Sequence, residues 1–211
     1  MKIFTKKSIL FLGVLLGGFL FSDDIKANTN DADVKKVENY LNSLKTLKAN
    51  FVQIASNGEK VEGKIYIEKP NKIRMEYNEP SNILIVGNGD YIVYYDKELE
   101  QVTNIDYEDV PAALILASEV SIDGKELNVT DFYKDPGVTR VSLQYKKAED
   151  LGPFTLLFTN SPFALRQWKV VTPQAMEVSL SLYDTVIDNK FEDGLFEFSK
   201  KEERKDKYRR K

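Results

Sequence analysis

The chain has 211 residues and a formal net charge of −3, and 42% of its residues are apolar, including 12 Phe and 11 Tyr. This length and composition indicate one globular domain with a sizeable core. The chain has no cysteine and no histidine, which excludes disulfides, cysteine nucleophiles, Ser-His-acid hydrolysis and ordinary zinc chemistry, so we expect no metal and no cofactor.

The N-terminus has the pattern of a secretory signal peptide, which we place at residues 1–27. Lys2, Lys6 and Lys7 precede an uncharged run of 14 residues, 8–21, and the small residue Ala27 follows. The alternative is an uncleaved membrane anchor, but the run is shorter than the roughly 20 residues of a spanning helix. We therefore expect export and a location in the periplasm.

The domain that follows, residues 28–199, begins with a predicted helix from Asp31 to Lys48. Asn30 or Asp31 is a plausible N-cap. Apolar residues recur there in steps of three and four, which places them on one face of a helix. These residues are Val34, Val37, Leu41, Leu44 and Leu47.

After the helix the apolar period changes to two, which predicts short strands separated by turns. The pair Asn57-Gly58 is a strong hairpin signal, and Pro70-Asn71 breaks the returning strand. Turns every eight to twelve residues are typical of an antiparallel sandwich or barrel. We expect a bent antiparallel sheet of about ten or eleven strands with two or three helices. The expected strands are 51–56, 60–69, 73–77, 83–86, 91–95, 99–105, 127–133, 138–145, 154–159, 165–171 and 176–184, with a last short one near 195–198.

The segment 110–117 interrupts this ladder. It has no alternation, is nearly wholly apolar and carries Pro111 at a plausible first helical position after Asp109. We predict a short apolar helix, which must be covered either by the sheet or by a ligand.

Two patterns that could indicate an enzyme are weak. The segment 58–65 nearly matches a phosphate-binding loop, but Ile65 occupies the magnesium-ligating position and no helix follows. The acidic residues could supply a carboxylate pair for glycoside hydrolysis, although solvated surface acids explain them better. We expect no enzymatic activity.

Charge is uneven along the chain. Residues 28–199 carry 18 basic against 28 acidic side chains, which argues against nucleic acid as a partner. The tail 200–211 carries eight basic against three acidic side chains. It is expected to be a disordered, solvated terminus, and contact with anionic lipid headgroups is the alternative.

Several stretches resemble the periplasmic lipoprotein carrier family, LolA. They are 63–80 with its Lys69-Pro70-Asn71 turn, 85–96 and 99–103, and residues 160–170 resemble the alphaproteobacterial form. The resemblance implies a mainly β fold, an unclosed antiparallel β-barrel with helices lidding its concave cavity. It also implies a monomeric chaperone that takes lipoproteins from an inner-membrane ABC transporter to an outer-membrane receptor, or to the outer membrane itself. A lipid- or lipoprotein-sensing regulatory module on the same scaffold is the alternative.

The resemblance also suggests roles for individual residues. Lys69 stands where relatives have an arginine that holds the lid closed, and lysine lacks the planar multi-donor fork. Ile73 stands where relatives have an aromatic residue that contacts the transporter. Leu41→Glu is expected to abolish cargo retention with the fold intact. Nine residues are predicted to contact acyl chains: Val37, Leu41, Leu44, Phe51, Ile65, Ile67, Met75, Ile92 and Leu114.

Overall fold

The computed structural model describes residues 31–122, 124–172 and 175–200. The predicted signal peptide and all but the first residue of the basic tail lie outside this part of the chain. No helix within these residues has both the length and the apolar character needed to cross a bilayer. The regular elements are α1 (Asp31–Ser43), β1 (Thr46–Ala55), β2 (Lys60–Glu68), β3 (Lys72–Tyr77), β4 (Ile83–Asn88), β5 (Ile92–Asp96), β6 (Gln101–Ile105), η1 (Tyr107–Asp109), η2 (Pro111–Leu116), β7 (Leu127–Lys134), β8 (Val138–Tyr145), η3 (Glu149–Leu151), β9 (Phe154–Asn160), β10 (Phe163–Val171) and β11 (Glu177–Ile187), where η denotes a 3-10 helix.

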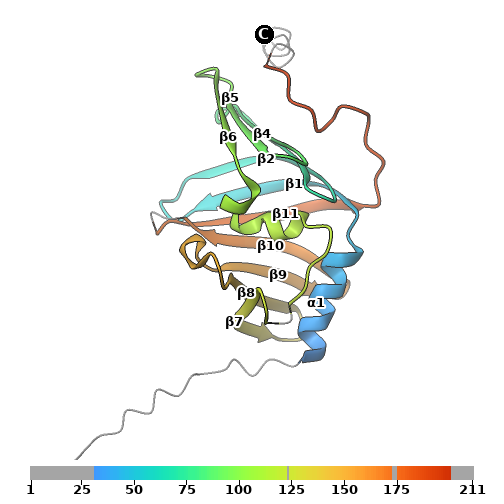
Figure 1. Ribbon diagram of the computed structural model, residues 1–211. Helices are drawn as coiled ribbons and strands as arrows, with labels where there is room; N and C mark the ends of the chain where they lie inside the picture. Colours follow the sequence, from blue (N-terminus) through green and yellow to red (C-terminus); the bar gives the residue numbers. More distant parts are fainter. Residues whose placement is uncertain (1–30, 123, 173–174, 201–211) are drawn as a thin grey trace, which may run out of the picture.

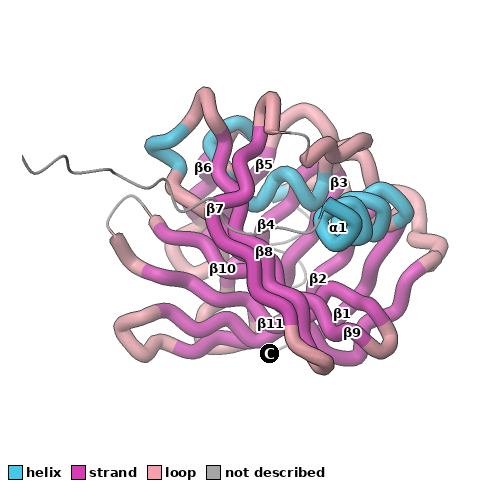
Figure 2. The backbone as a smooth tube through the Cα atoms, turned by 90° about the horizontal axis from the view of Figure 1, so that it is seen from below, coloured by secondary structure: helices cyan, strands magenta, loops and turns pink. Residues whose placement is uncertain are grey.

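The eleven strands form one antiparallel sheet in the order β6-β5-β4-β3-β2-β1-β11-β10-β9-β8-β7. Strands that follow one another in the chain are neighbours in the sheet, except β6 and β7, which form its two edges. The pairing of β1 with β11 joins the two halves of the sheet. The sheet curves strongly, and its edge strands β6 and β7 do not pair with each other (Figures 1 and 2). The predicted fold class, an unclosed antiparallel barrel of ten or eleven strands, is confirmed.

One face of the sheet, which we call the inner face, is covered by α1 and η2. Alternation along β2 shows how the sequence defines it, because Gly63, Ile65 and Ile67 are buried while Lys64 and Tyr66 between them are not. The inner faces of β8 and β9 are equally apolar, so one buried cluster extends from α1 across both halves of the sheet. Burial of this apolar surface is the main stabilising contribution to the fold.

The predicted helix 31–48 is too long, because α1 ends at Ser43. The amide of Leu44 donates to the Tyr40 carbonyl at 3.1 Å, and the Ser43 hydroxyl donates to the same carbonyl at 2.8 Å. Strand β1 then starts at Thr46 rather than Phe51 and pairs with β2 and β11. The position of Leu47 fits both the helical spacing of apolar residues and the alternation of a strand. Hydrogen bonding to β2 on one side and β11 on the other favours the strand.

The chain crosses from one sheet edge to the other over the inner face, through η1 and η2. The predicted helix 110–117 is here a six-residue 3-10 helix rather than an α-helix. The Ala113 amide donates to the Val110 carbonyl, and Ala117 to Leu114, three residues apart in each case. Leu114, Ile115 and Leu116 are consecutive and all buried. Because they are covered on more than one side, packing decides the conformation of this segment.

The predicted strand at 195–198 is also wrong. These residues belong to an irregular segment, 189–199, which contains a turn at 193–196. We call this segment the strap, and it lies on the outer face of the sheet. Phe198 packs against a separate buried cluster there, and its ring is 5.3 Å from that of Tyr95. Arg74 donates to the Leu195 carbonyl at 3.3 Å. The strap contacts the sheet through side chains and has no hydrogen-bonded neighbouring strand, so its apolar residues do not form a strand. The cluster beneath it comprises Leu84, Val86, Val93 and Tyr95.

Removing the strap should destabilise the protein and expose this outer cluster. A chain ended at Asp188 should lose about 3 kcal/mol of unfolding free energy in urea. The truncation removes Phe196, which is buried, and a buried phenylalanine contributes about 1.5–3 kcal/mol. It should also bind an apolar dye and self-associate. A chain ended at Lys200 keeps the strap and is the matched control. Equal stability of the two chains would contradict the role we give the strap.

Candidate functional site

One cavity lies between η2 and the inner face of the sheet, and we call it the apolar cavity. Its volume is about 280 Å³. Residues from β1 to β6, β10, β11 and the η2 segment form its wall, so residues far apart in sequence meet there. The lining residues are Gln53, Ile67, Ile73, Met75, Tyr77, Ile85, Ile92, Ile105, Val110, Ala113, Ile115, Leu116, Trp168, Val170, Val178 and Leu180.

Two polar side chains in this wall, Gln53 and Tyr77, form a hydrogen bond with each other. The Tyr77 hydroxyl donates to Gln53 Oε1 at 2.8 Å, and the Tyr77 ring stands edge-on to Phe51 with 5.0 Å between ring centroids. Burial raises the pKa of Tyr77 far above its ordinary value, so the phenol stays neutral. The wall therefore offers apolar contact and no charged group.

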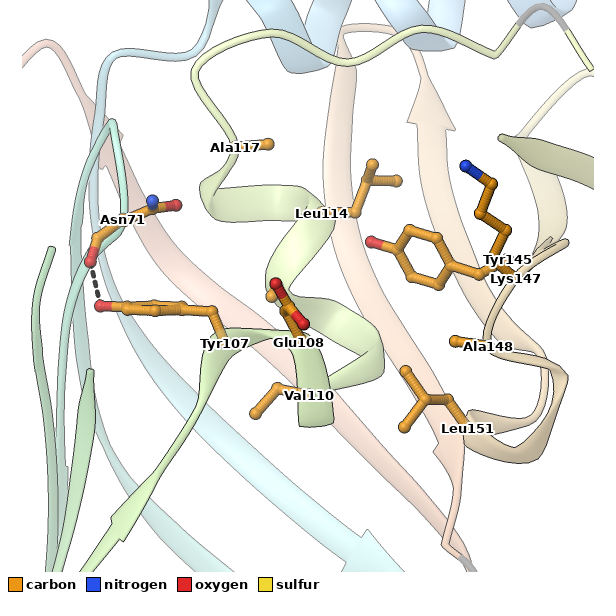
Figure 3. A pocket seen from close by; sticks show the side chains of 11 residues that line it. Asn71, Tyr107, Glu108, Val110, Leu114, Ala117, Tyr145, Lys147, Ala148 and Leu151 are labelled. Atoms are coloured by element: carbon orange, nitrogen blue, oxygen red, sulfur yellow. Dashed lines mark hydrogen bonds between the residues drawn. The ribbon is translucent and has the colours of Figure 1, made fainter. Parts of the chain in front are cut away.

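A second cavity, of about 420 Å³, lies on the other side of η2, and we call it the mixed cavity (Figure 3). Val110 and Ala113 line both cavities, so the η2 segment is the partition between them. The mixed cavity also has polar groups in its wall. Its lining residues are Asn71, Tyr107, Glu108, Val110, Ala113, Leu114, Ala117, Tyr145, Lys147, Ala148 and Leu151.

The η2 partition is anchored to the β2–β3 turn. The backbone N–H of Asn71 donates to the Leu116 carbonyl at 2.9 Å. The Tyr107 hydroxyl donates to the Asn71 carbonyl and accepts from the Gly89 amide, the latter at 3.3 Å. These bonds hold the chain before and at the end of η2, while Leu114, Ile115 and Leu116 contribute apolar contact.

Helix α1 is tied to the loop that follows η2. Asn42 makes two hydrogen bonds with the backbone of Val120, one as donor at 2.9 Å and one as acceptor at 2.7 Å. The Ile122 amide donates to Glu38 Oε2 at 2.8 Å. We therefore treat α1, η2 and the loop 117–122 as one connected unit, which we call the lid.

The far side of α1 rests on the β7–β10 half of the sheet. The Tyr40 ring stands edge-on to Phe158 and Phe163, with 5.4 and 5.7 Å between centroids. Lys134 of β7 forms an ion pair with Asp33 at 2.6 Å. These contacts anchor the α1 part of the lid more firmly than η2 is anchored.

A model of the family described as "Outer membrane lipoprotein carrier protein LolA" matches residues 42–199. The chain belongs to the LolA family. Among its relatives, the outer-membrane lipoprotein carrier protein of Pseudoalteromonas translucida is 30% identical over 82% of this chain and 70% of its own length. The carrier of Legionella pneumophila is 27% identical over 83% and 80%, and an uncharacterized protein of Rickettsia prowazekii is 26% identical over 93% and 89%.

Solved structures with a similar fold include a LolA superfamily protein from Nitrosomonas europaea. It covers 78% of this chain and 97% of its own, with a TM-score of 0.46 and 8% sequence identity. A DUF1329 family protein from Desulfovibrio piger gives a TM-score of 0.49 at 10% identity, over 78% of this chain and 95% of its own.

In this LolA-family protein all nine predicted acyl-contact residues are buried, but only four of them border a cavity. Ile67, Met75 and Ile92 line the apolar cavity, and Leu114 lines the mixed cavity. The other five pack in the core and border neither cavity: Val37, Leu41, Leu44, Phe51 and Ile65. Their contact with acyl chains stays a prediction that requires the lid to move.

The structure makes Leu41→Glu an unsuitable test of cargo binding. Leu41 is fully buried between α1 and the sheet. A carboxylate there would be desolvated without a partner, which costs several kcal/mol and would threaten the fold itself. Ile73 lines the apolar cavity and is half-buried, and its contact with a partner stays a prediction.

Sequence reasoning missed much of the cavity wall. Ile85 on β4, Trp168 on β10 and Leu180 on β11 were not among the candidates, although all three border the cavity. A signal was present for Leu180, because residues 178–182 of β11 alternate between apolar residues and serine. That alternation indicates the inner face but not which residues border a cavity.

Lys69 makes one contact that bears on the lid. Its Nζ donates to the Leu41 carbonyl, near the C-terminal end of α1, at 2.8 Å. A cation there is favoured by the helix dipole. Burial, and secondarily the nearby Lys45 charge, lower the pKa of Lys69 to about 8. The position matches the predicted gate, and the gating role itself stays a prediction.

This lowered pKa predicts a pH effect. The folded protein should bind fewer protons at Lys69 than the unfolded chain between pH 8 and 10.5, so its stability should rise with pH in that range. Solvent screening of this half-buried group should limit the gain to about 1 kcal/mol. Urea unfolding at pH 7.5 and 9.5 should show a larger rise for wild type than for Lys69→Met. Equal changes in the two proteins would refute the effect.

Proposed function

We propose that this protein is an exported carrier that shields the acyl chains of lipoproteins in the periplasm and catalyses no reaction. The observation that carries the proposal is the apolar cavity, which lies between η2 and the curved sheet and has no charged residue in its wall. An acyl chain offers only apolar surface, and such a wall complements it. Membership of the LolA family supports the same cargo.

The lid must move for this cargo to enter. The cavity volume of about 280 Å³ lies at the lower limit of the roughly 300–1,000 Å³ typical of ligand pockets. Because Val110 and Ala113 border both cavities, displacement of η2 would merge the two spaces. We infer that the closed lid is the empty state and that loaded protein has η2 displaced.

Competition between η2 and cargo would keep binding reversible. Each methylene removed from water gains about 0.8 kcal/mol, so a lipoprotein with two or three chains resists leaving a membrane by tens of kcal/mol. Leu114, Ile115 and Leu116 occupy apolar surface that the cargo would otherwise cover. Their return on unloading would recover part of the free energy of binding, so that transfer onward is favourable.

Loading then depends on a donor that supplies the energy. We propose that an inner-membrane lipoprotein-releasing ABC transporter delivers the cargo, and that an outer-membrane receptor or the outer membrane itself accepts it. The half-buried Ile73 fits contact with cargo better than contact with the transporter, since its side chain faces the cavity.

The test uses two matched peptides and an uncharged apolar dye, N-phenyl-1-naphthylamine (NPN). The purified protein should enhance NPN fluorescence, and a tripalmitoylated cysteinyl peptide should displace the dye. The same peptide without acyl chains should not displace it. Acylated peptides should also copurify from the periplasm and be identified by mass spectrometry. Displacement by both peptides alike, or by neither, would refute acyl-chain binding.

A further inference from the structure

The mixed cavity differs chemically from the apolar cavity beside it. Its floor is apolar, formed by Val110, Ala113 and Leu114 of the η2 segment and by Leu151 opposite. Its wall also carries a phenol, an ammonium group and a carboxylate. A purely apolar ligand would leave those three groups unused.

Tyr145 presents its hydroxyl to the interior of this cavity. Figure 3 shows the hydroxyl directed toward Leu114 of η2. The ring is held by Phe154, with 5.9 Å between centroids, and within the described part of the chain the hydroxyl has no hydrogen-bond partner. Burial raises the pKa of Tyr145, so the phenol keeps its proton at neutral pH and can donate.

Lys147, which follows β8, and Glu108 of η1 also line this cavity, and both are exposed, so they lie where it opens to solvent. Lys147 makes no ion pair or hydrogen bond with any residue that the structure describes, and the same holds for Glu108. The opening therefore offers donors in Tyr145 and Lys147 and an acceptor in Glu108. Carbonyl oxygens of esters and amides can only accept, and these donors complement them.

The two cavities share the η2 segment as their wall, so one ligand could occupy both once η2 moves. Its apolar part would enter the apolar cavity, and its polar, hydrogen-bonding part would remain beside Tyr145. We propose that the mixed cavity binds the polar junction of a lipoprotein, where glyceryl esters and amides join the acyl chains to the first residues of the polypeptide. This inference rests on the proposed function and assigns a second subsite to it.

The experiment compares a ligand that has this junction with one that lacks it. Tripalmitoylated cysteinyl peptide carries the esters and amides, whereas NPN has two aromatic groups joined by one amine and no carbonyl. Tyr145→Phe and Lys147→Met should each lower the affinity for the lipopeptide about fivefold, as expected for loss of one hydrogen bond. The affinity ratio of lipopeptide to NPN should fall by the same factor. Tyr91→Phe, on the exposed β4–β5 turn, is the matched control and should leave the ratio unchanged.

An unchanged ratio in both variants would overturn the proposal while leaving acyl-chain binding in place. Equal loss of lipopeptide and NPN affinity would make Tyr145 a structural residue and would overturn it as well. Wild-type protein that binds neither ligand would refute the proposed function, and the subsite with it.

Discussion

Ile85→Glu should lower the affinity for NPN and for the tripalmitoylated peptide by about 100-fold, equivalent to about 3 kcal/mol. Ile85 is half-buried and borders the apolar cavity from β4. A carboxylate at this position would lie in the path of an acyl chain, which would have to desolvate the charge without supplying a partner. In the empty protein the new side chain can stay hydrated through the cavity, so the fold should survive.

The control is Ile54→Glu, the same substitution on the outer face of β1, where the side chain is 49% exposed. It should bind both ligands like wild type. Urea unfolding of the two variants separates lost binding from lost folding. Wild-type affinity in a folded Ile85→Glu protein would show that cargo does not occupy the apolar cavity.

Gly63→Ala should lower the free energy of unfolding by about 3–5 kcal/mol, or prevent folding, because overpacking against a fixed backbone cannot relax cheaply. A β-carbon at Gly63 would overlap the Glu76 carbonyl oxygen of β3 and would lie 2.7 Å from the Phe51 ring. Gly63 pairs with Phe51 on β1 and with Tyr77 on β3, so it lies between two hydrogen-bonded neighbours in the part of the sheet that walls the apolar cavity.

Gly137→Ala is the matched control, since a β-carbon there would meet only the Asp135 carboxylate at 3.4 Å. It should change the unfolding free energy by less than about 1 kcal/mol. Circular dichroism and urea titration give both values. A Gly63→Ala protein as stable as this control would mean that β2 and β3 are not packed as closely as described.

The strand ladder follows from local signals, and the structure confirms it. Asn57-Gly58 and Pro70-Asn71 stand between consecutive strands, as the turn chemistry predicts. Alternation in β2 and β11 correctly assigned their buried faces. These features depend on residues a few positions apart, so a single sequence contains them. The family resemblance was likewise visible in such local stretches, and the family model confirms it.

The errors came where a local pattern fitted two conformations. Leu44 and Leu47 suit the period of a helix, but the hydrogen bonds offered by β2 and β11 end α1 at Ser43. The apolar segment 110–117 fitted an α-helix, and the surfaces around it impose a short 3-10 helix. The apolar residues at 195–198 suited a strand. The strap lies on the face of the sheet, where the backbone of the sheet offers it no hydrogen bonds, and not at an edge.

The sequence by itself determined the strands, the turns between them and the apolar side of the sheet. Only the tertiary structure decided which apolar residues border a space and which fill the core. Val37 and Ile67 are equally apolar and equally buried, yet only Ile67 faces the apolar cavity. The physical reason is that periodicity reports the side to which a residue points, whereas a cavity depends on what stands opposite. Here that is η2, which Asn71, from a distant part of the chain, holds by hydrogen bonds with the Leu116 carbonyl and the Tyr107 hydroxyl.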